Sequence, residues 1–200
     1  MIRQFYLIRH GRTKGNLEGR YVGITDEPLC QEGRAELLQF KGWDFYPEVQ
    51  AVFTSPLRRC KETSLLIYPD KNPQIITSFC ETNFGKFEYK NYEELNGDTD
   101  YQRWIDSGGK AAIPGGESRT KVQHRLAHGF LKMMKACEDE KIDTAAVIAH
   151  GGTIMELMNM YGFPEEDFYH WQVKNGCGIA AEVEIEDGKF TIRFSDWIRP

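Results

Sequence analysis

Short runs of apolar residues recur along this 200-residue chain and predict the strands of a β-sheet that is covered on both faces. The expected strands cover residues 5–8, 49–53, 74–77, 145–149, 178–185 and 190–194. Between them, apolar residues at helical spacing predict helices over residues 32–41, 58–68, 118–139 and 153–161. Strands that alternate with helices are typical of an α/β protein with a mostly parallel sheet.

Two segments modify this regular alternation. The last two expected strands are joined by a turn sequence at residues 186–189, so we expect one strand at an edge of the sheet to run antiparallel. Residues 79–116 are rich in aromatic side chains and end in Pro114-Gly115-Gly116, which indicates a cap-like helical excursion over the sheet edge. No repeat or linker divides the chain, and we expect a single domain over residues 1–200.

Composition limits the partners and the compartment. The formal net charge of -5 argues against nucleic-acid or anionic-membrane partners, because both favour basic surfaces. The five cysteines are scattered without a Cys-x-x-Cys pair, which predicts neither a disulfide framework nor a zinc knuckle. With no signal-peptide pattern and no apolar window of membrane-spanning length, we expect a cytoplasmic protein.

Two segments almost 140 positions apart carry the same pattern. Residues 6–13 and 146–153 each form an apolar run that stops at a His-Gly pair, at His10 and at His150, and then reaches a threonine able to cap a helix. If both runs are parallel strands, both imidazoles lie at the sheet edge where open α/β sheets usually bind ligands. The repeat therefore predicts a site built on two histidines.

Arginines beside these histidines indicate phosphate chemistry. Arg9 precedes His10, and the strand expected at residues 49–53 is followed by Arg58-Arg59 at the start of a helix. Planar guanidinium groups suit phosphate oxygens, and neutral imidazole can attack phosphorus near pH 7. We therefore expect His10 to be the nucleophile, with its second ring nitrogen held by a nearby backbone carbonyl. We expect His150, in its protonated form, to bind a phosphoryl oxygen.

The charge balance of this site makes a metal unnecessary. Two guanidinium groups and one imidazolium can balance a phosphate dianion, and the sequence has no carboxylate triad for Mg²⁺, so we expect no metal or other cofactor. Backbone amides after Gly11 and Gly151 would add anion contacts at helix N-termini. His124 and His128 have the spacing of a zinc pair, but both fall opposite the apolar stripe of their helix, which predicts solvated side chains.

Five sequence elements, in order along nearly the whole chain, resemble those of the histidine phosphatase superfamily, also called the phosphoglycerate mutase-like family. They are Arg9-His10-Gly11 with Thr13 and Asn16; Ser55 with Leu57, Arg59 and Thr63; Glu81 with Phe84-Gly85; residues 114–118; and His150-Gly151-Gly152. An Arg-His-Gly sequence alone is a weak signal, whereas five elements in the family order form a specific one.

The resemblance implies a fold and a set of catalytic groups. The fold would be a three-layer αβα sandwich with a small helical cap, and the phosphoryl group would be carried on His10. Arg9, Arg59 and His150 would bind the phosphate. Glu81 would protonate the leaving oxygen and then act as the base for the attacking water.

Further positions are implied to contact the substrate. Asn16 would bind the phosphate, although it can also simply stabilise the first helical turn, and Gly151 would lie beside it. A loop flanking the site would contribute Arg20, Tyr21 and Gly23. The chain departs from the family pattern at Phe87-Glu88-Tyr89, where Trp-Glu-Gly is favoured. The loss of that glycine affects the local backbone geometry and the selectivity for the leaving group.

Three functions fit this pattern. The favoured one is a metal-independent phosphomonoesterase that hydrolyses a small phosphorylated metabolite, similar in size and motifs to α-ribazole-phosphate phosphatases and broad-specificity relatives. The alternative is a phosphoglycerate mutase, but only 32 residues separate Glu81 from Pro114, and a short cap favours hydrolysis. The third is a non-catalytic phospholigand-binding module, a class that tends to lose the nucleophile or the acid. We expect a monomer or a homodimer.

Overall fold

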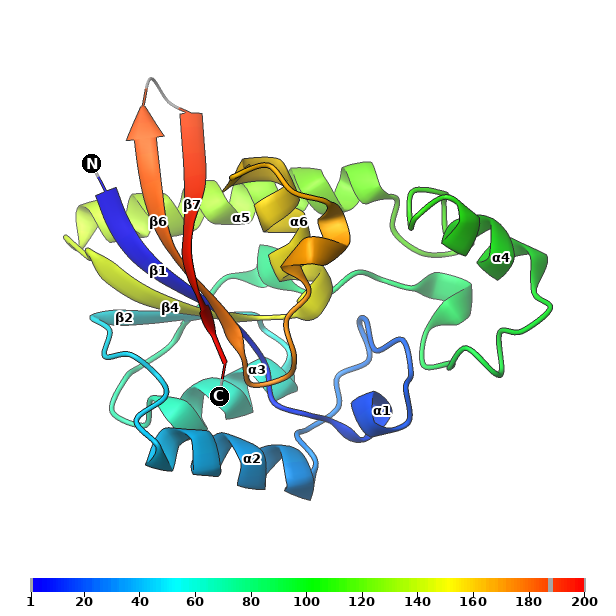
Figure 1. Ribbon diagram of the computed structural model, residues 1–200, viewed down its shortest axis with the longest axis horizontal. Coiled ribbons are helices and arrows are strands. Elements are labelled where there is room, and N and C mark those ends of the chain that lie inside the picture. The colour runs from blue at the N-terminus through cyan, green and yellow to red at the C-terminus, as the bar shows by residue number, and fades with distance from the viewer. Residues whose placement is uncertain (1, 187–188, 200) are drawn as a thin grey trace.

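The computed structural model describes residues 2–186 and 189–199, and its helices lie on both faces of a mixed β-sheet (Figure 1). The strands are β1 (Ile2–Arg9), β2 (Ala51–Thr54), β3 (Gln74–Ile75), β4 (Thr144–Ala149), β5 (Gly162–Phe163), β6 (Gly178–Glu186) and β7 (Lys189–Ile198). The α-helices are α1 (Lys14–Leu17), α2 (Gln31–Gly42), α3 (Arg58–Ile67), α4 (Thr99–Asp106), α5 (Arg119–Asp139) and α6 (Gly151–Tyr161). Short 3-10 helices are η1 (Thr77–Phe79), η2 (Gly85–Phe87) and η3 (Phe168–Trp171).

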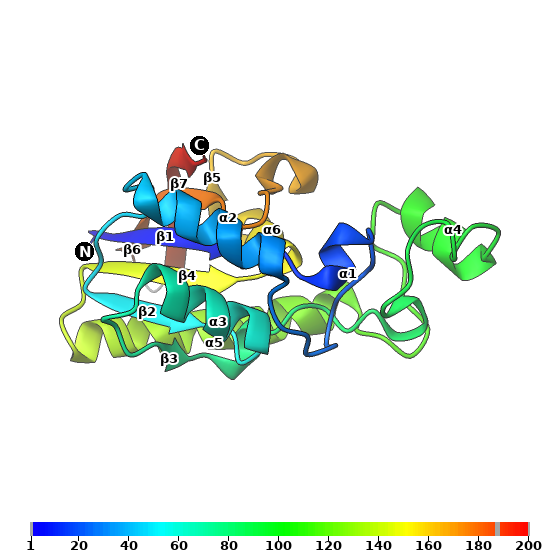
Figure 2. The ribbon, with the colours of Figure 1, turned by 90° about the horizontal axis from the view of Figure 1, so that it is seen from below.

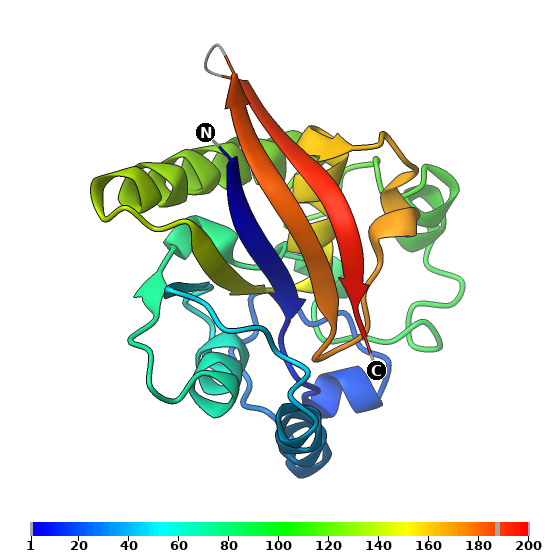
Figure 3. The ribbon, with the colours of Figure 1, turned by 60° about the vertical axis from the view of Figure 1, so that its left-hand side comes forward.

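The sheet is parallel on one side and mixed on the other, where the two-residue β5 pairs in parallel with β7. Its strands are ordered β3-β2-β4-β1-β6-β7-β5. The four strands β1 to β4 are parallel, β6 runs antiparallel to β1, and β7 runs antiparallel to β6. Figure 3 shows β1, β6 and β7 side by side. The expected α/β class with antiparallel pairing near one edge is confirmed, while the tip of the expected turn, residues 187–188, lies outside the described residues.

Alternating side chains of β4 fill the two apolar layers of the core. Ala145, Val147 and Ala149 belong to the apolar cluster that includes residues of α5 and α6. Ala146 and Ile148 belong to the cluster on the other face, which includes residues of α2 and α3. Figure 2 shows α2 and α3 covering that second face. A strand buried on both faces explains the uninterrupted apolar run in the sequence.

The longer elements follow the apolar pattern closely, and the short ones do not. The four expected helices correspond to α2, α3, α5 and α6, and β7 continues to Ile198 beyond its expected end. The sequence predicted a helix start at Thr13, which is the N-cap of α1, and a helical excursion that contains α4, but it gave bounds for neither helix. It did not predict the two-residue β5. Helix α4 has a short apolar stripe, formed by Tyr101, Trp104 and Ile105, none of which is fully buried. Its start is fixed by the Asp98 side chain, which accepts from the backbone N–H groups of Asp100 and Tyr101. No helix of the described residues is long and apolar enough to cross a membrane.

The excursion expected at about residues 79–116 holds η2 and α4 and projects beyond the end of the sheet (Figure 1). Its interior is a small apolar cluster of its own, formed by Phe87, Leu95 and Ile113. Aromatic side chains pack against this cluster, namely Tyr21, Phe84, Tyr101 and Trp104. The aromatic composition of the segment is therefore explained by a second, small core above the sheet edge. A single domain over residues 1–200 stays a prediction.

Candidate active site

The register of the sheet brings the two histidines together. Parallel pairing of β1 with β4 aligns Arg9 with Ala149, so His10 and His150 each follow the last paired residue of neighbouring strands. The backbone N–H of His10 also donates to the carbonyl of Ala149 over 3.0 Å. The centroids of the two imidazole rings lie 5.2 Å apart. Both rings are thus placed at the carboxyl end of the parallel strands, the edge expected from the sequence repeat.

One ring nitrogen of His10 is committed to the backbone. Nδ1 lies 2.7 Å from the carbonyl oxygen of Gly11, and because a carbonyl only accepts, Nδ1 carries the proton. The lone pair of the neutral ring is then on Nε2. Burial, together with the guanidinium groups of Arg59 and Arg9, holds the pKa of His10 well below its ordinary value of 6.5. The geometry and the pKa both favour a neutral imidazole with a free Nε2.

We predict that His10 stays neutral below the pH at which an ordinary imidazole is protonated. A lowered pKa extends the neutral form to lower pH, so at about pH 5.5, one unit below the ordinary value, His10 is expected to keep its Nδ1–H tautomer. Two-bond ¹H–¹⁵N correlation spectra of labelled protein report ring tautomers, and the His10→Ala spectrum assigns the signals. Full protonation of the His10 ring at that pH would contradict the prediction.

His150 is held from both sides in a fully buried position. Its Nδ1 accepts a hydrogen bond from Nε of Arg59 at 3.2 Å, and its Nε2 lies 2.7 Å from the Ser55 hydroxyl. Burial, and then the charge of Arg59, hold the pKa of His150 well below its ordinary value. The structure therefore places a neutral ring where the sequence suggested an imidazolium. The physical reason is the neighbouring guanidinium, which needs an acceptor at Nδ1. A phosphate contact from His150 stays a prediction.

Arg59 is fully buried behind His150. Its Nη1 donates to the carbonyl of Thr25 at 2.8 Å, and its Nη2 donates to the carbonyls of Val22 at 3.2 Å and Gly23 at 2.7 Å. These bonds tie the loop at residues 22–25 to the end of β4. The side chain positions that loop and His150 in this structure, and its role as a phosphate ligand stays a prediction.

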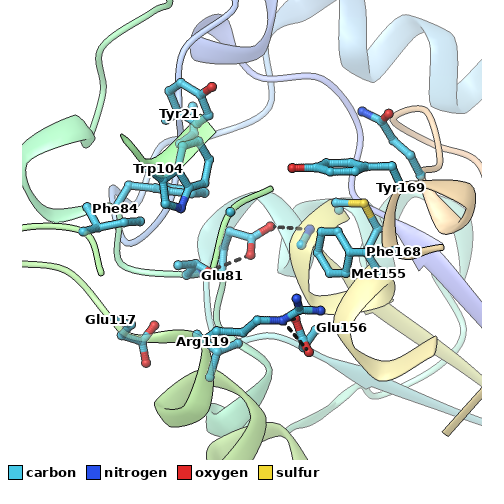
Figure 4. A pocket seen from close by; sticks show the side chains of 18 of the residues that line it. Tyr21, Glu81, Phe84, Trp104, Glu117, Arg119, Met155, Glu156, Phe168 and Tyr169 are labelled. Carbon is cyan, nitrogen blue, oxygen red and sulfur yellow. Dashed lines mark hydrogen bonds and ion pairs between the residues drawn. The ribbon is translucent and has the colours of Figure 1, made fainter. Parts of the chain in front are cut away.

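A cavity of about 470 Å³ opens at the carboxyl end of the sheet, beneath the cap (Figure 4). Seven of the expected site residues line it, namely Arg9, His10, Asn16, Arg20, Tyr21, Glu81 and Gly151. His150, Arg59 and Gly23 do not line this cavity. The structure thus separates the expected residues into a group that faces the cavity and a group that supports it from behind.

Arg9 lies against the start of α6. Its Nη1 donates to the carbonyl of Val173 at 2.9 Å, and its buried Nε has no partner among residues 2–186 and 189–199. A Cβ atom at Gly151 would lie 3.3 Å from the Arg9 Cζ atom, so glycine lets the guanidinium pack on the backbone at the helix N-terminus. A guanidinium beside a helix N-terminus is suited to a phosphate anion.

Glu81 is buried at the same helix N-terminus, and two backbone amides orient its carboxylate. The Thr82 N–H donates to Oε1 at 2.8 Å and the Gly152 N–H donates to Oε2 at 2.9 Å. A Cβ atom at position 152 would lie only 2.5 Å from Oε1. Glycine at position 152 is therefore required for Glu81 to occupy this place. The two residues after His150 thus make room for the arginine and for the carboxylate.

Asn16 caps α1 in addition to lining the cavity. Its Oδ1 accepts from the Thr13 N–H at 3.2 Å, which is one half of a reciprocal capping box, and from Nδ2 of Asn175 at 3.2 Å. Asn175 also donates to the carbonyl of His10 at 3.0 Å. Asn175 was not predicted as a site residue. The Asn-Gly pair at 175–176 is a turn signal in the sequence, and it marks the loop before β6.

Arg20 and Tyr21 line the cavity, and both also contact the excursion over residues 79–116. Arg20 pairs with Glu18 at 2.5 Å and with Glu94 at 2.7 Å. The Tyr21 hydroxyl lies 2.9 Å from that of Tyr101. Both residues thus join the loop after α1 to the excursion.

Glu88 organises the loop from the cap side, and the sequence analysis assigned it no role. One carboxylate oxygen accepts from the Gly23 N–H at 2.9 Å and from the N–H and hydroxyl of Thr25 at 3.0 and 2.8 Å. The other accepts from the Phe84 N–H at 3.1 Å. The next residue, Tyr89, has a φ of 60°, a left-handed conformation that explains why glycine is favoured there. Tyr89 therefore adopts, without a glycine, the left-handed conformation that glycine adopts most readily.

Gly23 supports the loop because only a glycine fits there. A Cβ atom would lie 2.0 Å from the backbone oxygen of Thr82. We predict that Gly23→Ala lowers the free energy of unfolding by about 1–3 kcal/mol, the usual cost of overpacking. Gly42→Ala is the matched control, since nothing lies within 4 Å of that position. Chemical denaturation measures both, and equal stability of the two variants would contradict the prediction.

The remaining histidines lie outside the site. His124 and His128 are exposed on α5, as expected from the apolar stripe. His170 is exposed on η3, where its ring lies 4.8 Å from that of Trp171.

Comparison with known proteins agrees with this geometry. Residues 5–197 match the family model described as histidine phosphatase superfamily (branch 1). An adenosylcobalamin/alpha-ribazole phosphatase of Escherichia coli (strain K12) is 25% identical over 185 residues, covering 90% of each chain. A 2,3-bisphosphoglycerate-dependent phosphoglycerate mutase 2 of Gloeobacter violaceus is 30% identical over 195 residues, covering 92% of this chain and 87% of the mutase.

Solved structures share the fold. The crystal structure of the alpha-ribazole phosphatase from Shigella flexneri superimposes with a TM-score of 0.76 at 23% identity, and the match covers 96% of this chain and 95% of that one. The fold is therefore that of a histidine phosphatase. The chain belongs to the histidine phosphatase superfamily, branch 1. The expected class of enzyme, a phosphatase of this superfamily, is confirmed, and mutases also stand among its relatives.

Proposed function

We propose that the protein is a metal-independent phosphomonoesterase that forms a phosphohistidine on His10. The observation that carries the proposal is the tautomer of His10, whose Nδ1 is bound to the Gly11 carbonyl and whose Nε2 is left with the lone pair beside the cavity. Arg9 lines the same cavity, and its Nε has no hydrogen-bond partner among the described residues. Glu81 also lines the cavity, with a carboxyl group that two backbone amides hold in place. These are a nucleophile, a cation and a proton carrier around one space.

The reaction follows in two transfers. In the first, Nε2 of His10 bonds to phosphorus, the bond from phosphorus to the ester oxygen breaks, and Glu81 gives its proton to the leaving oxygen. In the second, Glu81 takes a proton from water, the water oxygen bonds to phosphorus, and the P–N bond breaks. Inorganic phosphate leaves, and His10 is again neutral with its proton on Nδ1. Arg9 and the positive N-terminal end of α6 stabilise the charge on the phosphoryl oxygens in both steps.

The substrate we propose is a small phosphorylated metabolite. A cavity of about 470 Å³ can enclose an alcohol considerably larger than glycerate. Related proteins are named as alpha-ribazole, phosphoserine and other phosphatases, which supports a phosphate monoester of modest size. Cytoplasmic location, absence of a nucleic-acid partner, and a monomeric or homodimeric state remain predictions from the sequence.

Phosphate release from p-nitrophenyl phosphate tests the proposal, with the chelator EDTA in parallel. Turnover that persists unchanged in EDTA is expected, since arginine and backbone amides supply the positive charge. Absolute dependence on added metal would overturn the proposal. The same preparation is assayed with 3-phosphoglycerate, where interconversion with 2-phosphoglycerate without phosphate release would identify the mutase alternative instead.

A further inference from the structure

A further cation, Arg119, lines the same cavity as Arg9 and Arg20. It is the first residue of α5, and its Nε donates to both carboxylate oxygens of Glu156, at 3.2 and 2.9 Å. Its guanidinium carbon lies 4.7 Å from the centroid of the Phe168 ring. Its buried Nη2 has no hydrogen-bond partner within residues 2–186 and 189–199. The outer edge of the fork is therefore held in place and unused.

Glu156 does not require that outer edge. Besides the Arg119 Nε, the carboxylate accepts from Nε2 of Gln123 at 2.7 Å and from Nδ2 of Asn159 at 3.2 Å. It is almost fully buried, with 4% of its surface exposed. A buried carboxylate that is itself held by several donors fixes the direction of the guanidinium, because the N–H groups of the planar fork point along fixed directions. The carboxylate thus orients Arg119 and leaves its terminal nitrogens for a ligand.

The walls around Arg119 are aromatic on two sides. Tyr21, Phe84 and Trp104 lie on one side of the cavity, and Phe168 and Tyr169 lie on the other, with Arg119 below them (Figure 4). Glu81 lies between the two groups in the same view. Flat apolar groups pack well between aromatic faces. The part of the cavity beyond Glu81 is therefore walled by aromatic faces, with one guanidinium edge at its base and the Glu117 carboxylate, which is paired with Arg125, beside it.

We propose that Arg119 determines substrate specificity by binding a carboxylate on the leaving alcohol, whose flat apolar body lies between the aromatic walls. The inference rests on the proposed phosphatase reaction, because it places the alcohol of the ester beyond Glu81. The preferred substrate is then a phosphate monoester of a flat alcohol that carries an anionic group. Two parallel N–H···O bonds from the free edge of the fork would recognise that group.

The test compares aryl phosphates that differ in one charge. The substrates are 3- and 4-carboxyphenyl phosphate, each paired with its neutral carbamoyl analogue, and the readout is the ratio of kcat/KM within each pair. We expect Arg119→Gln to lower this ratio by roughly 10- to 100-fold for at least one pair, the range for a hydrogen bond to a charged group. Taking the ratio in each variant cancels differences in leaving-group chemistry.

Two further variants sharpen the result. Arg119→Lys keeps the charge and lacks the planar fork, so an intermediate ratio is expected, and it serves in place of Arg119→Gln if that variant does not fold. Arg103→Gln, on the exposed face of α4, is expected to leave the ratio at the wild-type value. A ratio that is the same in wild type, Arg119→Gln and Arg119→Lys overturns this inference while leaving the phosphatase reaction intact. If wild type hydrolyses none of the esters, the proposed function fails, and this inference fails with it.

Discussion

His10→Ala is expected to reduce kcat/KM for p-nitrophenyl phosphate by about 10⁴-fold or more, the scale seen when a covalent nucleophile is removed. The structure gives the reason. No other imidazole lines the cavity, among the described residues, and His150 has both ring nitrogens engaged, by Arg59 and Ser55. Steady-state phosphate release measures the loss.

The controls separate loss of chemistry from loss of fold. His10 is only 3% exposed, so its removal can affect stability. His10→Asn retains a side-chain N–H near the place of Nδ1, able to donate to the Gly11 carbonyl, and is expected to be as inactive as the alanine variant. His124→Ala, exposed on α5, is expected to keep full activity. Activity of His10→Asn within about tenfold of wild type would contradict the nucleophile assignment.

Glu81→Gln is expected to slow alkyl phosphates by about 10²–10⁴-fold and p-nitrophenyl phosphate much less. An alkoxide is strongly basic and leaves only when protonated, whereas p-nitrophenolate leaves without help. The parameter to compare is kcat/KM, because it reports the steps up to phosphorylation of His10. The later hydrolysis of the phosphohistidine is common to all substrates, so kcat can fall for both.

Glutamine also disturbs the local hydrogen bonds, and the comparison accounts for this. Both oxygens of Glu81 accept backbone amides, from Thr82 and Gly152, and the glutamine amide group can accept at only one of these positions. The change in hydrogen bonding acts on both substrates. The ratio of the two losses in kcat/KM therefore reports the loss of proton transfer to the leaving group. Glu138→Gln on the exposed face of α5 is the matched control. Equal losses for aryl and alkyl esters would exclude Glu81 as the acid.

Local sequence patterns predicted the features that depend on neighbouring residues. The repeated His-Gly segments follow apolar runs, and the parallel register of β1 with β4 turns that similarity into adjacency of His10 and His150. The carbonyl partner of His10 was also expected, since Gly11 is the next residue. The first feature follows from the pairing of two buried strands, and the apolar pattern of the sequence predicts those strands. The second is a contact between adjacent residues of the chain.

Contacts between distant segments could not be predicted in this way. The orientation of Arg59 depends on carbonyls at residues 22–25, and that of Glu88 on amides of the same loop. Asn175 reaches His10 from the loop before the neighbouring strand β6, and Arg119 is fixed by Glu156 from another helix. Each is an unremarkable polar residue in sequence, because its role is created only when the chain folds. Family motifs identified Arg59 as important without giving its direction.

In the proposed reaction, His10 carries the phosphoryl group between the two transfers. Rapid-quench trapping with a ³²P-labelled phosphate monoester detects that intermediate directly. We expect ³²P to become attached to the protein and to be released from it at rates fast enough to support turnover. The attached label should be stable to base and labile to acid. Proteolysis should place the label on the peptide that contains His10, and His10→Ala should carry none. Label on another residue, or turnover by His10→Ala at the wild-type rate, would contradict the account.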